Sequence, residues 1–101
     1  MNVKGFKTRM KIADAAIKLC EHTHYHEFTL RMLEEASGCA FAVVRYHFPT
    51  MKTLQDCMMS RAIQTESLTV LAMGLADKND IARNAPKKLK MKALKHLDWV
   101  G

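Results

Sequence analysis

The sequence predicts an all-α protein. Apolar residues recur at helical spacing along most of the chain, Gly and Pro separate these stretches, and no segment alternates in the manner of a β-strand. With 101 residues, of which 49% are hydrophobic and 26% charged, the chain is long enough for one compact fold with a small core. Partner contacts could therefore supply a large share of its stability.

The first expected helix runs from Thr8 to about Thr23 and carries one apolar stripe, formed by Ile12, Ala15, Ala16, Leu19 and Cys20. A second, shorter helix is expected over Leu30–Ser37. Thr29 precedes it and is a suitable N-cap, because its hydroxyl can accept a hydrogen bond from a free N–H of the first turn. Gly38 should end this helix, because glycine adopts the left-handed backbone conformation at little cost.

A third helix is expected from about Ala40 to Phe48, where Pro49 ends it. Thr50 is a plausible cap for a long fourth helix from Met51 into the seventies, in which the methionines are expected mainly to fill the core. Asp77–Asp80 is expected to be a turn. Pro86 suits the start of a last helix, whose apolar side contains Leu89, Ala93, Leu94 and Leu97.

Positive charge is concentrated at the two ends of the chain. The formal net charge is +6, and the first eleven residues carry four basic residues, Lys4, Lys7, Arg9 and Lys11, without an acidic one. The end of the chain is rich in lysine as well. Such ends suit contact with phosphates, although solubility would explain them equally well. The amphipathic C-terminal segment could lie on DNA, on an acidic partner or on a membrane surface, or dock onto the body through Leu89, Leu94, Leu97 and Trp99.

Residues 28–54, FTLRMLEEASGCAFAVVRYHFPTMKTL, resemble the N-terminal helix-turn-helix domain of the TetR family of transcription regulators. The resemblance extends over about residues 8–62 and depends on the spacing of the punctuating residues. In the family, a Thr opens the second helix, a Gly ends it, and the third helix closes on an aromatic pair. Thr29, Gly38, Tyr46, His47, Phe48 and Thr50 occupy the corresponding places here. The resemblance implies a domain over residues 1–65, followed by a helical extension with a basic end over residues 66–101.

The sequence also departs from the family pattern. Ala40 replaces the usual Ser cap of the third helix, and Arg45 replaces a Tyr that often contacts a phosphate. The family's regulators carry a further ligand-binding and dimerising domain, whereas this chain ends at Gly101. The resemblance therefore implies a regulator without that domain.

The outward face of the third helix should present Phe41, Ala42 and Arg45, with Cys39, Val43 and His47 turned inward. Arg45 could contact a guanine edge, and Phe41 or Ala42 could touch thymine methyl groups. The same surface would also suit a protein partner, because aromatic and Arg side chains dominate interface hot spots. The candidate residues for binding nucleic acid or a partner are Lys4, Lys7, Arg9, Thr29, Phe41, Ala42, Arg45, Tyr46 and Lys52.

Other classes of function find little support in the sequence. The alternation of Cys20 with His22, His24 and His26 lacks the spacing of a zinc site, and no cofactor or catalytic motif is present, so no enzyme is expected. No membrane span is expected either, since no apolar run is long enough. Cys20, Cys39 and Cys57 are expected to be reduced thiols of a cytoplasmic protein, with Cys20 and Cys57 in the core.

The sequence therefore predicts a DNA-binding transcriptional regulator of TetR-like type that lacks a ligand-binding domain. Double-stranded DNA is the expected partner, and a homodimer is expected because operators are read as paired half-sites. The alternative is a small helical module that uses the same scaffold to bind and inhibit another regulator or an enzyme.

Overall fold

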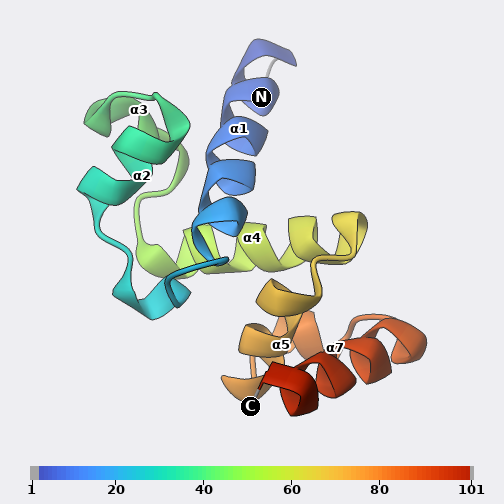
Figure 1. The fold of residues 1–101 in the computed structure, drawn as a ribbon. Helices are drawn as coiled ribbons and strands as arrows, with labels where there is room; N and C mark the ends of the chain where they lie inside the picture. Colours follow the sequence, from blue (N-terminus) through green and yellow to red (C-terminus); the bar gives the residue numbers. More distant parts are fainter. Residues whose placement is uncertain (1–2, 101) are drawn as a thin grey trace. The chain divides into compact units, whose positions relative to one another are not determined.

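The computed structural model describes the backbone of residues 3–100 and the side chains of residues 3–96. This part of the chain is all-helical, as the sequence predicts, and contains no β-strand (Figure 1). Its elements are α1 (Val3–Leu19), the short 3₁₀ helix η1 (Tyr25–Glu27), α2 (Leu30–Ser37), α3 (Phe41–His47), α4 (Met51–Thr65), α5 (Leu68–Ala76), α6 (Asp80–Arg83) and α7 (Lys87–Val100).

The helices form two compact units that divide between Gln55 and Asp56, within α4. In the first unit α1 packs against α2, and α2 packs against α3, so that these three helices lie together (Figure 1). Its buried side chains come from every element of the unit: Ile12, Ala13, Ala16, Cys20, Tyr25, Phe28, Leu33, Val44, Phe48 and Leu54.

In the second unit α5 packs against both α7 and α6 (Figure 1). Its core contains the buried residues Met58, Met59, Ala62, Val70, Leu71, Ala72, Ala82, Ala85, Leu89 and Ala93. Met58 and Met59 are fully buried, which confirms that these methionines fill the core. A Cβ built on Gly74 of α5 would lie 2.5 Å from the end of the Met59 side chain and 2.9 Å from the Ala82 Cβ. Glycine is therefore required at this position for α5 to pack closely.

The predicted ends of α2 are confirmed. The Thr29 hydroxyl accepts a hydrogen bond from the Met32 N–H at 3.1 Å, which satisfies one of the free donors of the first turn. At the other end Gly38 has a φ of 71°, and its N–H donates to the Glu34 carbonyl at 2.9 Å. Thr50 likewise caps α4, because its hydroxyl accepts from the Thr53 N–H at 3.2 Å.

Three helix boundaries differ from the prediction. α1 ends at Leu19 instead of about Thr23. α1 begins at Val3 instead of Thr8, so the basic N-terminal residues belong to helical turns. The prediction of one long fourth helix from Met51 into the seventies is wrong, because α4 ends at Thr65 and α5 begins at Leu68. At this break Glu66 has a φ of 55°, and the Ser67 N–H donates to the Ala62 carbonyl at 2.8 Å. This hydrogen bond closes α4 in the manner of a Schellman motif, for which glycine is the usual sequence signal.

The C-terminal segment agrees with the prediction only in part. Asn79, within the predicted turn, caps the short helix α6 by accepting from the N–H groups of Ile81 and Ala82. Leu89 and Ala93 of α7 are buried as expected, but Leu94 is 50% exposed and does not dock onto the body. The side chains of Leu97 and Trp99 lie outside the described residues.

Candidate nucleic-acid interface

The turn between α2 and α3 holds the two short helices in a defined relation. Gly38 reverses the chain, and the Cys39 N–H donates to the Ser37 hydroxyl at 3.1 Å. Ala40 precedes α3 and makes no side-chain capping hydrogen bond, as its lack of a polar group requires. The first turn of α3 therefore has no side-chain cap from the residue that precedes it.

One face of α3 is anchored in the core of the first unit. Val44 is 1% exposed, His47 8% and the following Phe48 3%. The inward packing of His47 and Phe48 is therefore confirmed. The prediction for Val43 is wrong, because this side chain is 38% exposed and Val44 takes the inward position. Val43 is four and Val44 three residues before the buried His47, and both spacings place a side chain on the same helix face as His47, so the spacing alone does not decide between the two valines.

The opposite face of α3 is open to solvent. Phe41, Ala42 and Arg45 are exposed, as the helical spacing predicts, and Tyr46 is 79% exposed. The Arg45 guanidinium lies over the Phe41 ring, 5.7 Å from its centroid. Because the two residues are four apart on one helix, this cation–π contact steadies both side chains. We call Phe41, Ala42, Arg45 and Tyr46 the outward face of α3.

Arg9 connects α1 to the C-terminal end of α3. Its Nη1 donates a hydrogen bond to the His47 carbonyl at 2.7 Å, and its guanidinium lies 4.5 Å from the centroid of the Phe48 ring. These contacts satisfy a terminal carbonyl of α3 with a cation, which a helix C-terminus favours. Arg9 is thus part of the structure that positions α3. The sequence, which suggested only a phosphate contact, gave no signal for this role.

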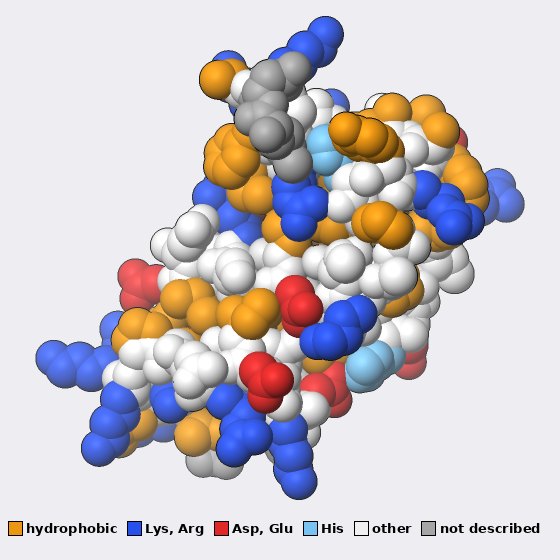
Figure 2. Space-filling model, turned by 180° about the vertical axis from the view of Figure 1, so that it is seen from behind, with side chains coloured by type: hydrophobic (Ala, Val, Ile, Leu, Met, Phe, Trp, Pro, Cys, Tyr) orange, Lys and Arg blue, Asp and Glu red, His pale blue; other side chains and the backbone are white. Residues whose placement is uncertain are grey.

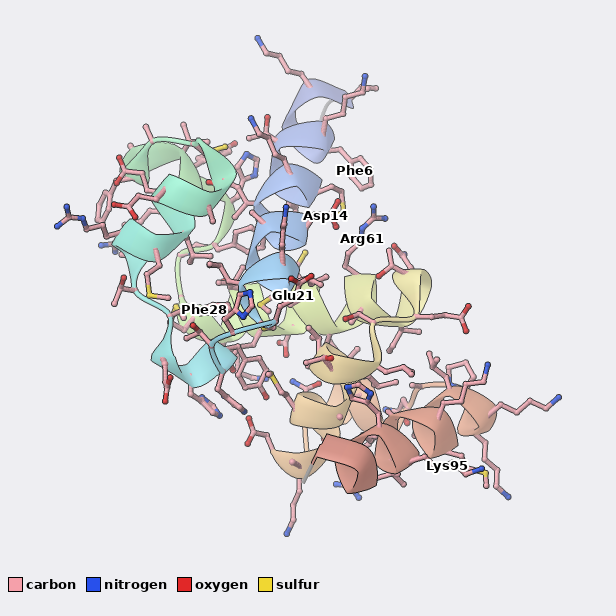
Figure 3. All side chains as sticks on the ribbon, viewed as in Figure 1. Phe6, Asp14, Glu21, Phe28, Arg61 and Lys95 are labelled. Carbon is pink, nitrogen blue, oxygen red and sulfur yellow. The ribbon has the colours of Figure 1, made fainter. Side chains whose placement is uncertain are left out.

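The remaining candidate residues lie on three elements of the same unit. Lys4 and Lys7 are exposed on the first turns of α1, beside Phe6, which also projects from this helix (Figure 3). Thr29 and Lys52 are exposed at the N-terminal ends of α2 and α4.

A hollow of about 180 Å³ brings several of these elements together. It is lined by Leu30, Arg45, Phe48, Pro49, Thr50 and Met51. Leu30 and Met51 are the first residues of α2 and α4, so the N-terminal ends of both helices border the hollow together with the Arg45 cation. Free backbone N–H groups, the positive ends of helix dipoles and a guanidinium all favour a negatively charged group.

The histidine-rich turn after α1 is organised by its own contacts. The His24 Nδ1 accepts from the His26 N–H at 3.1 Å, and the two rings stack with centroids 4.9 Å apart. Tyr25 between them is buried in the core. Within the described residues, no three His, Cys, Asp or Glu side chains gather as a metal site would require.

None of the three cysteines forms a disulfide bond. Cys20 lies in the core as predicted, and burial raises the pKa of its thiol to about 12. The prediction for Cys57 is wrong in degree, since this residue is only half-buried.

Comparison with known proteins adds no relative, because no family model, curated protein or solved structure matches this chain. In the part of the chain that the structure describes, every helix is too short or too polar to cross a membrane.

Proposed function

We propose that the first unit binds double-stranded DNA as a TetR-like helix-turn-helix domain and serves in transcriptional control. The observation that carries this proposal is the division of α3 into two faces. Val44 and His47 fix the helix in the core, while Phe41, Ala42 and Arg45 remain exposed for a partner. The second helix of such a motif enters the major groove of DNA in this way.

Contacts with the DNA backbone would come from elements around α3. The exposed cations Lys4, Lys7 and Lys52 are placed to neutralise phosphates, and the Thr29 hydroxyl can donate a hydrogen bond to one. The hollow beside Arg45 would receive a phosphate oxygen between the N-terminal ends of α2 and α4. Such contacts would fix the orientation of α3 on the duplex.

Base readout would depend on few side chains. Arg45 is the one residue of the outward face with several hydrogen-bond donors, and it suits the O6 and N7 atoms of guanine. Phe41 and Ala42 would make apolar contacts with thymine methyl groups. With so few direct contacts, the shape of the DNA would supply part of the specificity, and a homodimer would add a second half-site.

Binding to a generic duplex as a function of salt tests this proposal, because the phosphate contribution does not depend on sequence. The Lys4→Ala/Lys7→Ala variant should reduce the slope of log K against log salt by roughly 2, at about one unit per lost phosphate contact. Lys18→Ala/Lys92→Ala is a control of equal charge, at exposed lysines outside the basic N-terminal segment, and should change the slope less. Duplex binding that does not respond to salt would exclude the proposed mechanism.

Protein binding is a second candidate, because the exposed side chains of α3 are largely apolar. Phe41 is 45% exposed, Val43 38% and Tyr46 79%, all on one short helix. Truncating an aromatic anchor at a protein interface typically costs about 2 kcal/mol or more. On DNA, Phe41→Ala should leave the phosphate contribution intact, so salt-dependent duplex binding should persist. Wild-type protein that binds no duplex at low salt would favour the protein-interaction module instead.

A further inference from the structure

α7 of the second unit presents a face that no contact within the described residues covers. Leu89 and Ala93 on its other side are buried, and the His96 Nε2 lies 3.1 Å from the Thr69 hydroxyl of α5. Met91 is 52% exposed and Leu94 50% exposed. We call the exposed residues Lys87, Lys88, Met91, Leu94 and Lys95 the α7 face.

The α7 face combines strong positive charge with two apolar side chains. Residues 87–96 contain five lysines and no acidic residue. Lys90 is engaged, because its ammonium group donates to the Arg83 carbonyl at 2.8 Å, whereas the other four lysines are exposed. Figure 3 labels Lys95 on α7, and Figure 2 shows from behind that Lys and Arg side chains project along the lower edge of the molecule.

We propose that the α7 face binds the surface of an anionic lipid bilayer. The lysines would pair with anionic headgroups, and Met91 and Leu94 between them would enter the boundary between headgroups and acyl chains. The helix would lie along the surface, with its other side still packed on α5. Lysine suits this partner, because its flexible stem lets the ammonium group follow mobile headgroups without the fixed geometry of a guanidinium.

Other partners match the α7 face less well. A second copy of the face is disfavoured, since every charge on it is positive. A partner helix in a groove requires apolar anchors over at least two turns. Among the described residues, Met91 and Leu94 span a single turn, and the positions three and four residues before Met91 are Lys88 and Lys87. The backbone of a nucleic acid would pair with the lysines but offers no apolar counterpart to Met91 and Leu94.

Sedimentation with lipid vesicles tests the proposal, using phosphatidylcholine vesicles with and without phosphatidylserine. The full chain should bind the anionic vesicles and should bind the neutral ones far more weakly. The Lys88→Gln/Lys95→Gln variant should bind at least tenfold more weakly, since each lysine near an anionic surface contributes roughly fivefold. Met91→Ser/Leu94→Ser keeps all charges and should weaken binding on the order of tenfold.

Two controls make the outcomes decisive. Lys11→Gln/Lys18→Gln removes the same charge from α1 and should weaken vesicle binding less than the α7 variant does. Arg45→Ala, which tests DNA binding, should leave vesicle binding unchanged, so the two proposals can fail separately.

No binding to anionic vesicles at low salt would overturn the proposal. So would vesicle binding that is equally strong in Met91→Ser/Leu94→Ser. If the lysine variant instead weakens duplex binding while vesicles are not bound, the α7 face belongs to a nucleic-acid surface.

Discussion

At the scale of single residues, helical spacing predicted the exposure of Phe41, Ala42 and Arg45, because a period of 3.6 residues separates them from the inward positions. It failed for Val43, where two adjacent valines compete for one inward position. It could not predict Arg9, whose hydrogen-bond acceptor is the carbonyl of His47, thirty-eight residues later in the chain. A contact of this kind exists only once the tertiary structure has formed.

The contact between Arg45 and Phe41 predicts coupled effects on duplex binding. The losses of duplex-binding free energy in Arg45→Ala and Phe41→Ala should deviate from additivity by roughly 0.5–1 kcal/mol. The reason is that the Phe41 ring steadies the Arg45 guanidinium, so removing the ring also weakens the contacts of Arg45. A double-mutant cycle on duplex affinity measures this coupling. Arg31→Ala is the matched control, because this exposed arginine of α2 pairs with Glu35 of its own helix at 3.3 Å. Additive losses for Phe41 and Arg45 would show that the two side chains act independently.

The buried thiol of Cys20 predicts a pH dependence of stability. Its pKa in the folded protein, about 12, lies above the ordinary value of 9.0, so the folded state keeps the proton longer than the unfolded state. The contribution of this buried thiol to the free energy of unfolding is fully present below pH 9. It should be lost as the pH rises toward 12, by on the order of 1 kcal/mol for each pH unit. Denaturant unfolding of the wild type and of Cys20→Ala across this range measures the difference. Parallel pH profiles of the two proteins would contradict the assignment, as would rapid modification of Cys20 by a thiol reagent.

At the scale of secondary-structure elements, the sequence predicted those boundaries that carry a recognisable residue. Thr29, Gly38 and Thr50 mark the ends of α2 and the start of α4, and the structure confirms each of them. The break after α4 was missed because a glutamate, Glu66, holds the left-handed position there. An L-residue with a side chain seldom takes this conformation, so nothing in the local sequence indicated the end of the helix.

These two left-handed positions predict substitutions of opposite sign. Gly38→Ala should destabilise the protein by about 1 kcal/mol, since the φ of 71° disfavours a Cβ although nothing lies within 4 Å of it. Glu66→Gly should stabilise the protein by a similar amount, because it relieves the φ of 55°. Urea unfolding of both variants measures the two effects. A loss of stability in Glu66→Gly would mean that the glutamate side chain makes a contact worth more than the backbone preference.

At the scale of the whole chain, the all-helical class followed from the periodicity, but the division into units did not. The sequence predicted a boundary near residue 65, where the expected extension begins, whereas the compact units divide between Gln55 and Asp56 within α4. A helix that supplies Leu54 to one core and Met58 to the other shows a continuous apolar pattern in the sequence. Periodicity identifies such a helix but cannot indicate which core each of its turns joins.

The division into two cores predicts a local response to overpacking. Gly74→Ala should destabilise the second unit by roughly 1–3 kcal/mol, because the new Cβ would meet Met59 and Ala82. Hydrogen exchange should then accelerate for the amides of α5 and α7, while those of α2 and α3 keep the wild-type rates. Gly74→Ala/Ala82→Gly should recover part of the loss. Equal acceleration throughout the described helices would show that both cores unfold as one cooperative unit.

The hydrogen bond from Arg9 to the His47 carbonyl has a consequence for the thermodynamics of association. It ties α1 to the end of α3 in the free protein, so the two helices need not be brought into register when a ligand arrives. Binding should then lose little conformational entropy, and its rate should be governed by diffusion and charge instead of by a slow rearrangement. Arg9→Met would keep most of the packing on Phe48 but remove this hydrogen bond. In stopped-flow measurements, the Arg9→Met variant should therefore associate more slowly than the wild type, at a rate limited by a conformational change.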